Sequence, residues 1–160
     1  MTFGEIDVMS FDFIDDENIV VGYENTPELK IVRLDGKVVK TSNFKIDLPV
    51  TAPISYDKHL KSSKHDDIEP HYKQARFHPG KELIYRCYKG RTESADMFDF
   101  SENKLMIVDK NLDIIYDQKL PEVIMPLLFP YQDGLAGLVL NTETEDYIVV
   151  ARIIFMKKQT

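Results

Sequence analysis

The stretch MIVDKNLDIIYDQKL, residues 106–120, decides the fold, because the same design stands earlier at 30–44 as KIVRLDGKVVKTSNF. In each copy an apolar run leads into a short polar corner, Asp35-Gly36 or Asp109-Lys110-Asn111, and a second apolar run follows. Apolar positions alternate with polar ones, which is typical of a strand with one buried side. The Asp-Gly corner suits a two-residue turn with positive φ. Both copies therefore predict an antiparallel hairpin with one side facing a core.

A second shared pattern precedes these hairpins: an aromatic residue, a turn and a strand. It occurs in FDFIDDENIVVGYEN (11–25), ARFHPGKELIYRCYKG (75–90) and LLFPYQDGLAGLVLN (127–141). A four-stranded antiparallel unit that recurs about every 40 to 50 residues is the signature of a β-propeller blade. The alternative is a sandwich or barrel of similar short strands, which shares the alternation but gives no reason for the repeated order.

The predicted fold is therefore all-β, a partial β-propeller with two complete four-stranded antiparallel blades and a three-stranded last blade. We expect one domain over residues 1–160: a blade at 3–45, an insertion loop at 46–72, a blade at 73–120 and an incomplete last blade at 121–160. Closed propellers have about four to eight blades, so three cannot close. We expect a homodimer, missing N-terminal blades or another partner to cover the open edges.

Composition excludes several classes of function. The chain is 43% hydrophobic and 29% charged, as in soluble globular proteins. Its net charge of −7 opposes phosphate backbones, so nucleic acid is not an expected partner. No apolar run approaches the roughly 20 residues of a membrane helix, and the acidic opening MTFGEIDVMSFDF shows no signal peptide. Cys87 is the single cysteine, which excludes an intrachain disulfide.

Three stretches resemble the C-terminal half of an uncharacterised bacterial family of TolB-like six-bladed β-propeller proteins. They are FHPGKELIYRCYKG (77–90), LMIVDKNLDIIYDQKLPE (105–122) and DGLAGLVLNTETEDYIVVARIIF (133–155). Members of that family are commonly predicted envelope lipoproteins, so the resemblance implies a truncated or split relative of a protein that faces the cell envelope. The family has no established reaction, and the resemblance therefore implies no catalytic residue.

The histidines fall within 20 residues, at His59, His65, His71 and His78. Together with nearby acids they could supply the imidazole and carboxylate ligands of a zinc ion. Their spacing matches neither an H-x-x-x-H pair nor a hairpin clamp, and neighbouring lysines oppose a cation. A solvated polar loop therefore explains them better, and we expect no metal or other cofactor. His65 and His71 remain candidate ligand-binding residues.

The strand around Arg86 holds the other candidates for ligand binding. Alternation places Arg86 and Tyr88 on one side and Tyr85 and Cys87 on the other. The planar guanidinium of Arg86 suits a carboxylate or phosphate, although an inter-blade ion pair or an edge position would also explain it. Tyr88, and Arg91 just beyond the strand, complete the set. We expect Cys87 to be a small core residue.

The sequence predicts a binding or scaffold module, not an enzyme. Acids gather in turns, where two could form a general acid/base pair, but solvated turn acids are the commoner explanation. We expect loops, chiefly 51–72 and 89–96, to hold a peptide, glycan or protein. One alternative is a hydrolase or lyase that acts on polysaccharide or peptide through loop His, Asp or Glu residues. The other is an inactive fragment of a longer propeller.

Overall fold

The computed structural model describes residues 5–6, 9–44, 54–55, 71–90, 102–121, 124–139 and 149–154. These residues form strands and turns with no helix, which confirms the all-β prediction, and no long apolar helix that could cross a membrane occurs among them. The strands are β1 (Glu5–Ile6), β2 (Met9–Phe13), β3 (Asn18–Tyr23), β4 (Leu29–Arg33), β5 (Val38–Thr41), β6 (Ile54–Ser55), β7 (His71–Tyr72), β8 (Arg76–His78), β9 (Leu83–Lys89), β10 (Lys104–Val108), β11 (Ile114–Lys119), β12 (Ile124–Tyr131), β13 (Gly134–Val139) and β14 (Val149–Ile154).

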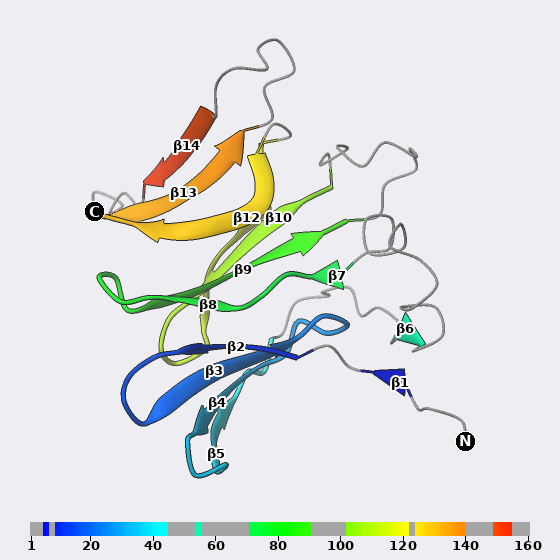
Figure 1. Cartoon of the computed structure of the whole chain (residues 1–160), viewed down its shortest axis with the longest axis vertical. Coiled ribbons are helices and arrows are strands. Elements are labelled where there is room, and N and C mark those ends of the chain that lie inside the picture. The colour runs from blue at the N-terminus through cyan, green and yellow to red at the C-terminus, as the bar shows by residue number, and fades with distance from the viewer. Residues whose placement is uncertain are drawn as a thin grey trace.

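Three antiparallel sheets account for most of these strands. The first sheet has the order β2-β3-β4-β5, and the third has the order β12-β13-β14. In the second sheet, β7 and β8 lie end to end along β9, and β10 and β11 follow. Strands β1 and β6 form a separate short pair. Each main sheet thus joins strands in chain order, and none of the sheets is closed (Figure 1).

The β4–β5 hairpin closes with a three-residue loop. The N–H of Arg33 donates to the carbonyl of Lys37 (2.9 Å), and the N–H of Gly36 donates to the carbonyl of Arg33 (2.9 Å). Gly36 has φ 87°, the left-handed value that glycine adopts most readily. The prediction of a two-residue turn at Asp35-Gly36 is therefore wrong, because the loop has three residues. It is a turn followed by one left-handed residue, Gly36, which gives a bulged hairpin.

The β10–β11 hairpin repeats this geometry 76 residues later (109 minus 33). The N–H of Asp109 donates to the carbonyl of Asp113 (3.1 Å), and the N–H of Leu112 donates to the carbonyl of Asp109 (2.9 Å). Leu112 has φ 60° at the position that Gly36 occupies in the first copy, and its side chain is buried in the core. The two similar stretches of sequence therefore encode one turn, built twice.

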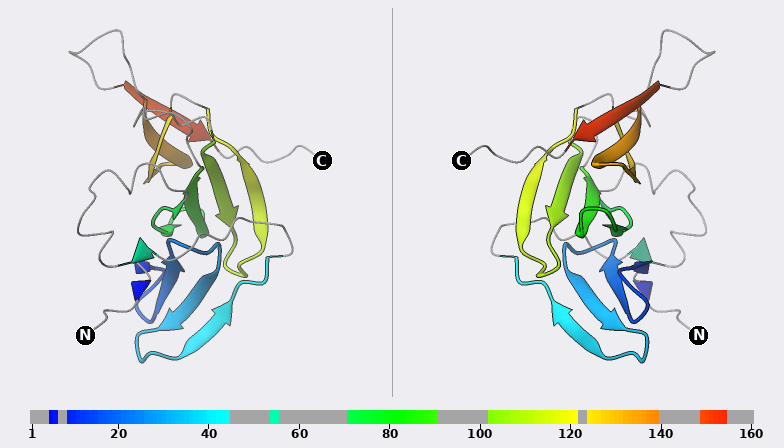
Figure 2. Two further views of the ribbon diagram at one scale, coloured as in Figure 1. Left: turned by 90° about the vertical axis from the view of Figure 1, so that its right-hand side faces the viewer. Right: turned by 90° about the vertical axis from the view of Figure 1, so that its left-hand side faces the viewer.

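Two apolar clusters hold the sheets face to face. The cluster between the first and second sheets consists of Val20, Leu29, Ile31, Ala75, Phe77, Ile84, Met106, Val108 and Leu112. The cluster between the second and third sheets consists of Tyr85, Cys87, Leu105, Ile107, Leu120, Ile124, Leu128 and Leu135. Figure 2 shows the three sheets in sequence along the long axis of the molecule. The second sheet is thus covered on both sides, and Tyr85 and Cys87 lie on the side opposite to Arg86, as the alternation predicted.

The connections differ between the two ends of this stack. One end, called the turn end, carries the short turns at 14–17, 34–37, 79–82, 109–113 and 132–133. At the opposite end, called the loop end, β3 connects to β4, β9 and β13 end, and β7, β10 and β14 begin (Figure 1). A hydrogen bond of 2.9 Å between His78 Nε2 and the carbonyl of Gly134 joins the turn ends of the second and third sheets.

Candidate functional site at the loop end of the second sheet

Three of the five candidate ligand-binding residues lie together at the loop end of the second sheet. Arg86 and Tyr88 are on β9, and His71 is on β7. The register of these strands pairs His71 with Lys89 and places Tyr88 beside Tyr72. The other two candidates, His65 and Arg91, lie outside the described residues. No observation tests ligand binding by any of the five, which stays a prediction.

Arg86 joins the first two sheets. Its side chain is only 1% exposed and faces the first sheet. Nε donates to the carbonyl of Lys73 (2.9 Å), Nη1 donates to the carbonyl of Thr26 (2.9 Å), and Nη2 donates to the carbonyl of Tyr23. Because Tyr23 ends β3 and Thr26 lies in the β3–β4 connection, the guanidinium bonds the first sheet to the second through main-chain atoms. Three of the five N–H groups of the guanidinium are thus bonded to main-chain carbonyls.

Small residues make room for this guanidinium. A Cβ atom added to Gly22 would lie 3.2 Å from Cζ of Arg86 and 3.3 Å from Cβ of Ala75. The ring of Tyr72 covers the other side of Arg86, with Cζ 4.5 Å from the ring centroid, a favourable cation–π distance. The N–H of Tyr72 also donates to the carbonyl of Glu24 (2.7 Å). Arg86 therefore sits in a pocket shaped by the first sheet on one side and an aromatic ring on the other.

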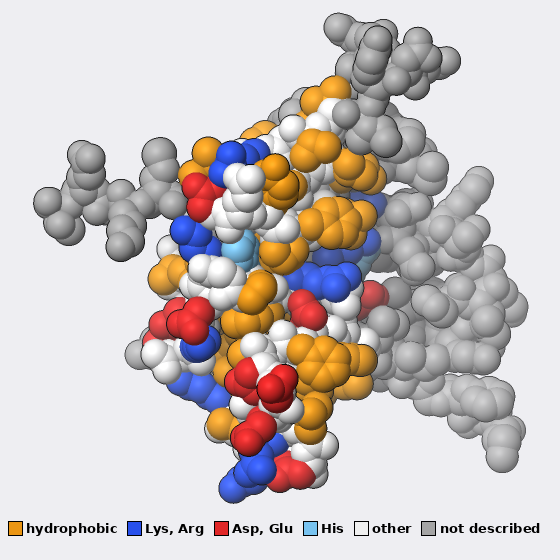
Figure 3. Space-filling view, turned by 60° about the vertical axis from the view of Figure 1, so that its left-hand side comes forward, with side chains coloured by type: hydrophobic (Ala, Val, Ile, Leu, Met, Phe, Trp, Pro, Cys, Tyr) orange, Lys and Arg blue, Asp and Glu red, His pale blue; other side chains and the backbone are white. Residues whose placement is uncertain are grey.

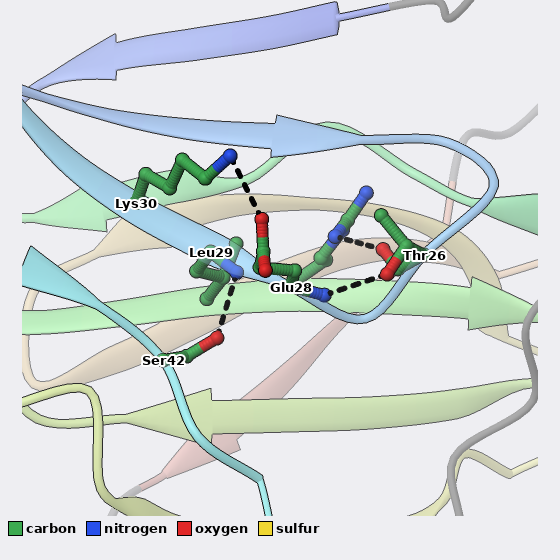
Figure 4. Close-up of polar contacts among 6 residues, drawn as sticks. Thr26, Glu28, Leu29, Lys30 and Ser42 are labelled. Atoms are coloured by element: carbon green, nitrogen blue, oxygen red, sulfur yellow. Dashed lines mark hydrogen bonds and ion pairs between the residues drawn. The ribbon is translucent and has the colours of Figure 1, made fainter. Parts of the chain in front are cut away.

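The β3–β4 connection is itself held in shape by side chains (Figure 4). The hydroxyl of Thr26 accepts a hydrogen bond from the N–H of Glu28 (3.3 Å), and the hydroxyl of Ser42 accepts one from the N–H of Leu29 (2.9 Å). The carboxylate of Glu28 pairs with Nζ of Lys30 at 2.9 Å. These contacts fix the main chain that presents the carbonyls of Tyr23 and Thr26 to Arg86.

Burial sets the electrostatics of this joint. Desolvation lowers the pKa of Arg86 from its ordinary value to about 9, while Tyr72 and Glu24 act in the opposite direction. The guanidinium is therefore still charged at neutral pH. Desolvation also raises the pKa of Tyr72 well above its ordinary value, so its hydroxyl stays protonated beside the cation.

Other buried polar side chains surround the start of the 91–101 connection. His71, Lys89 and Asn103 are all less than 7% exposed. A Cβ atom on Gly90 would lie 2.2 Å from Cβ of Glu102, so the chain that leaves β9 passes directly against the chain that returns to β10. The base of this connection is thus tightly closed by glycine, and the connection begins and ends at one point of the loop end.

The structure separates two of the histidines that were considered as metal ligands. His71 lies at the loop end, whereas His78 lies at the turn end, where its ring bonds to Gly134. A single ion cannot reach both. Among the described residues, no three His, Cys, Asp or Glu side chains gather as they would around a metal. His59 and His65 lie outside the described residues, and a site built on them stays untested.

The opposite side of β9 faces the third sheet. Tyr85 and Cys87 are buried there, and the hydroxyl of Tyr85 donates to the carbonyl of Leu128 (3.3 Å). This confirms the predicted core position of Cys87. A pocket of about 30 Å³ lies nearby, which is room for about one water molecule. It is lined by Lys73, Gln74, Arg76, Tyr85, Cys87, Leu127 and Leu128.

The thiol of Cys87 is expected to make stability depend on pH in alkaline solution. Burial raises its pKa from the ordinary 9.0 to about 12, so the unfolded chain loses this proton first. The contribution to stability is therefore complete below pH 9 and is lost as pH rises toward 12. In urea titrations, the free energy of unfolding should fall by about 2–3 kcal/mol more between pH 8 and pH 11 than it does for Cys87→Ala. The buried tyrosines are common to both proteins and cancel, so equal pH slopes would contradict this role.

The sequence did not identify the residues that accommodate Arg86. Gly22 interrupts the apolar run of β3, and a glycine inside a strand is a known sign that another group approaches closely. Ala75 and Tyr72 carry no such sign, because their role depends on which sheet packs against them.

Comparisons with known proteins give the fold alone. No family model and no curated protein matches the sequence of this chain. In structure the chain is similar to the crystal structure of a member of the DUF4221 family from Bacteroides vulgatus, with a TM-score of 0.66 and 14% sequence identity. The match covers 95% of this chain and 47% of that one, so this chain spans about half of that protein's length. The resemblance to TolB-like propellers stays a prediction.

Proposed function

We propose that this chain is three consecutive blades of a β-propeller and acts as a non-enzymatic binding or scaffold module. Each blade would be one of the three main sheets, and the insertion loop would join the first two. The first strands of the first and second sheets lie side by side. Gln74 Nε2 donates to the carbonyl of Phe11 (3.2 Å), and the carboxylate of Asp12 accepts a hydrogen bond from the N–H of Phe77 (2.9 Å). Sheets that meet through their first strands and pack face to face are arranged as propeller blades are.

The proposed binding site is placed at the loop end because the connections there are longer than those at the turn end. Four of the five short turns at the turn end hold at most four residues, whereas the connections 90–103 and 140–148 both leave from the loop end. The insertion 46–72 returns to the second sheet at the loop end too, because β7 begins there. Long connections on one end of a rigid scaffold are where binding residues concentrate. A peptide, glycan or protein would therefore bind at the loop end.

The candidate residues follow from this placement. His65 belongs to the insertion and Arg91 to the connection after β9, while His71 and Tyr88 stand at the strand ends beside them. Arg86 would act differently, by holding the first two sheets in the orientation that the loops require. A six-bladed TolB-like ring and a place in the cell envelope belong to the same proposal and are supported by the resemblance over residues 73–160.

Loop replacement tests the proposal. Arrays of peptides and glycans would be probed with the intact chain and with a variant whose residues 56–70 are replaced by a Gly-Ser linker of equal length, which keeps β6 and β7. We expect at least one class of array compound to bind the intact chain and to bind the variant about tenfold more weakly or worse, with an unchanged thermal midpoint.

Glu82→Ala is the matched control, because Glu82 is exposed at the turn end and pairs only with Lys110 among the described residues. Its binding should equal that of the intact chain. Compounds that bind equally to the loop variant would contradict a site in the insertion. Conversion of a bound compound into products, followed by mass spectrometry, would favour the hydrolase or lyase alternative.

A further inference from the structure

Both ends of the three-sheet stack present an apolar sheet face. The register of the strands defines these faces, because paired residues point to the same side. The first outer face, on the side of the first sheet away from the second, carries Met9, Phe11, Phe13, Ile19, Tyr23, Val32 and Val38. The third outer face, on the side of the third sheet away from the second, carries Leu127, Phe129, Tyr131, Ala136, Leu138, Val150 and Ile154.

These faces are too apolar to be ordinary protein surface. Nine of their side chains are between 45% and 58% exposed: Met9, Phe11, Phe13, Val38, Leu127, Phe129, Tyr131, Val150 and Ile154. Figure 3 shows hydrophobic side chains over much of the face turned forward, including its upper part, where the third sheet lies, and its lower part, where the first sheet lies. Contiguous exposed apolar surface of this kind marks an interaction site.

The stack itself shows which kind of surface each face fits. Within the chain, each sheet has a forward side, which faces the next sheet in chain order, and a backward side, which faces the preceding sheet. The forward side of one sheet packs on the backward side of the next. This order occurs twice, in the two apolar clusters. The third outer face is a forward side, and the first outer face is a backward side. The two faces are therefore complementary to each other in the same order, yet they lie at opposite ends of one molecule.

The charges on these faces permit burial against each other. Lys30 on the first outer face pairs with Glu28 at 2.9 Å. Arg152 on the third outer face pairs with Asp133, and its Cζ lies 5.5 Å from the ring centroid of Tyr131. Each cation is thus paired with a carboxylate of the same chain, so contact between the two faces would not bury an unpaired positive charge.

We propose that two copies of this chain bind head to tail, the third outer face of each on the first outer face of the other. This rests on the proposed propeller arrangement, in which two sets of three blades form one closed ring. The similar structure from Bacteroides vulgatus supports a second copy as the occupant, because this chain spans 47% of it and two copies supply about its length. Each copy would contribute both faces, giving two identical contacts and a closed dimer.

Sedimentation and light scattering of the purified 160-residue chain test the dimer. The intact chain should have twice the monomer mass. Phe11→Arg damages the first outer face, and Phe129→Asp damages the third. Either substitution places a charge in both contacts of a dimer, so each variant alone should dissociate with a dissociation constant raised about 100-fold or more. Leu34→Arg and Ile115→Asp are matched controls at exposed positions of a turn and an outer strand, and both should remain dimeric.

Mixing the two damaged variants separates this arrangement from others. In a head-to-tail dimer of Phe11→Arg with Phe129→Asp, both lesions fall in one contact and the other contact is intact. The mixture should therefore recover dimer that neither variant forms alone. A dimer made of two first outer faces would be broken by Phe11→Arg only and would not be rescued by mixing.

Three results would overturn the proposal: an intact chain that is monomeric, species larger than a dimer, or a dimer that survives both substitutions. If the chain were monomeric, the two outer faces would instead bind further sheets of a longer polypeptide or another partner. Amide exchange on each variant keeps these outcomes distinct from unfolding, because β9 and β10 should stay protected. The loop-end binding test does not depend on mass, so either proposal can fail without the other.

Discussion

Replacing Arg86 by alanine is expected to lower the free energy of unfolding by about 3–5 kcal/mol, a large part of the stability of an ordinary domain. The substitution leaves the carbonyls of Tyr23, Thr26 and Lys73 without the donor that satisfies them. It also empties the space between Gly22 and the ring of Tyr72. Urea unfolding followed by circular dichroism would measure the loss, and amide exchange should show it first where β3 and β4 connect.

Two further arginine variants sharpen this result. Arg33→Ala should change the free energy of unfolding by less than about 0.5 kcal/mol, since Arg33 is 46% exposed and makes a surface ion pair with Asp35 at 3.3 Å. Arg86→Lys should recover only part of the loss, because one ammonium cannot reach three carbonyls as the planar fork does. If Arg86→Ala were as mild as Arg33→Ala, the joint between the sheets would depend on the apolar cluster alone.

The period of the apolar residues was enough to predict the strands and hairpins. Alternation placed Tyr85 and Cys87 on one side of β9 and Arg86 and Tyr88 on the other, and the two clusters lie as this requires. It did not fix the turn at Asp35-Gly36, because the hydrogen bonds of the turn and not its composition decide whether two or three residues form the loop. A left-handed leucine at the equivalent position, Leu112, has no sequence signature.

The role of Arg86 was harder to predict, for a physical reason. An arginine in a strand can be explained as a ligand contact, an ion pair or an edge residue until the opposite sheet is known. Here its partners are main-chain carbonyls, and every residue, proline included, can supply a carbonyl in the same way. Two of the three partners lie 60 and 63 residues away in sequence. Local pattern therefore identified Arg86 as a candidate for a polar contact without identifying its burial or what it would bond.

Gly134→Ala is expected to break the third sheet. A Cβ atom at this position would lie 1.8 Å from the carbonyl oxygen of Ile153 and 2.8 Å from its carbonyl carbon, and both are main-chain atoms that no rotamer change can move. β14 would have to separate from β13 near its pairing of Gly134 with Ile154. We expect a loss of about 3 kcal/mol or more and a fall in amide protection of β13 and β14, while β3 and β4 keep theirs.

Gly80→Ala is the matched control, since Gly80 also lies at the turn end but has only ordinary contacts, the nearest at 3.5 Å from His78. Its substitution should be neutral or stabilise the fold by up to about 1 kcal/mol, because alanine restricts the unfolded chain more than glycine does. The pair separates close approach from glycine's general flexibility, which both positions share. If both variants lost stability equally, the close packing of β14 on Gly134 would be contradicted, and with it the edge of the sheet that supplies the third outer face.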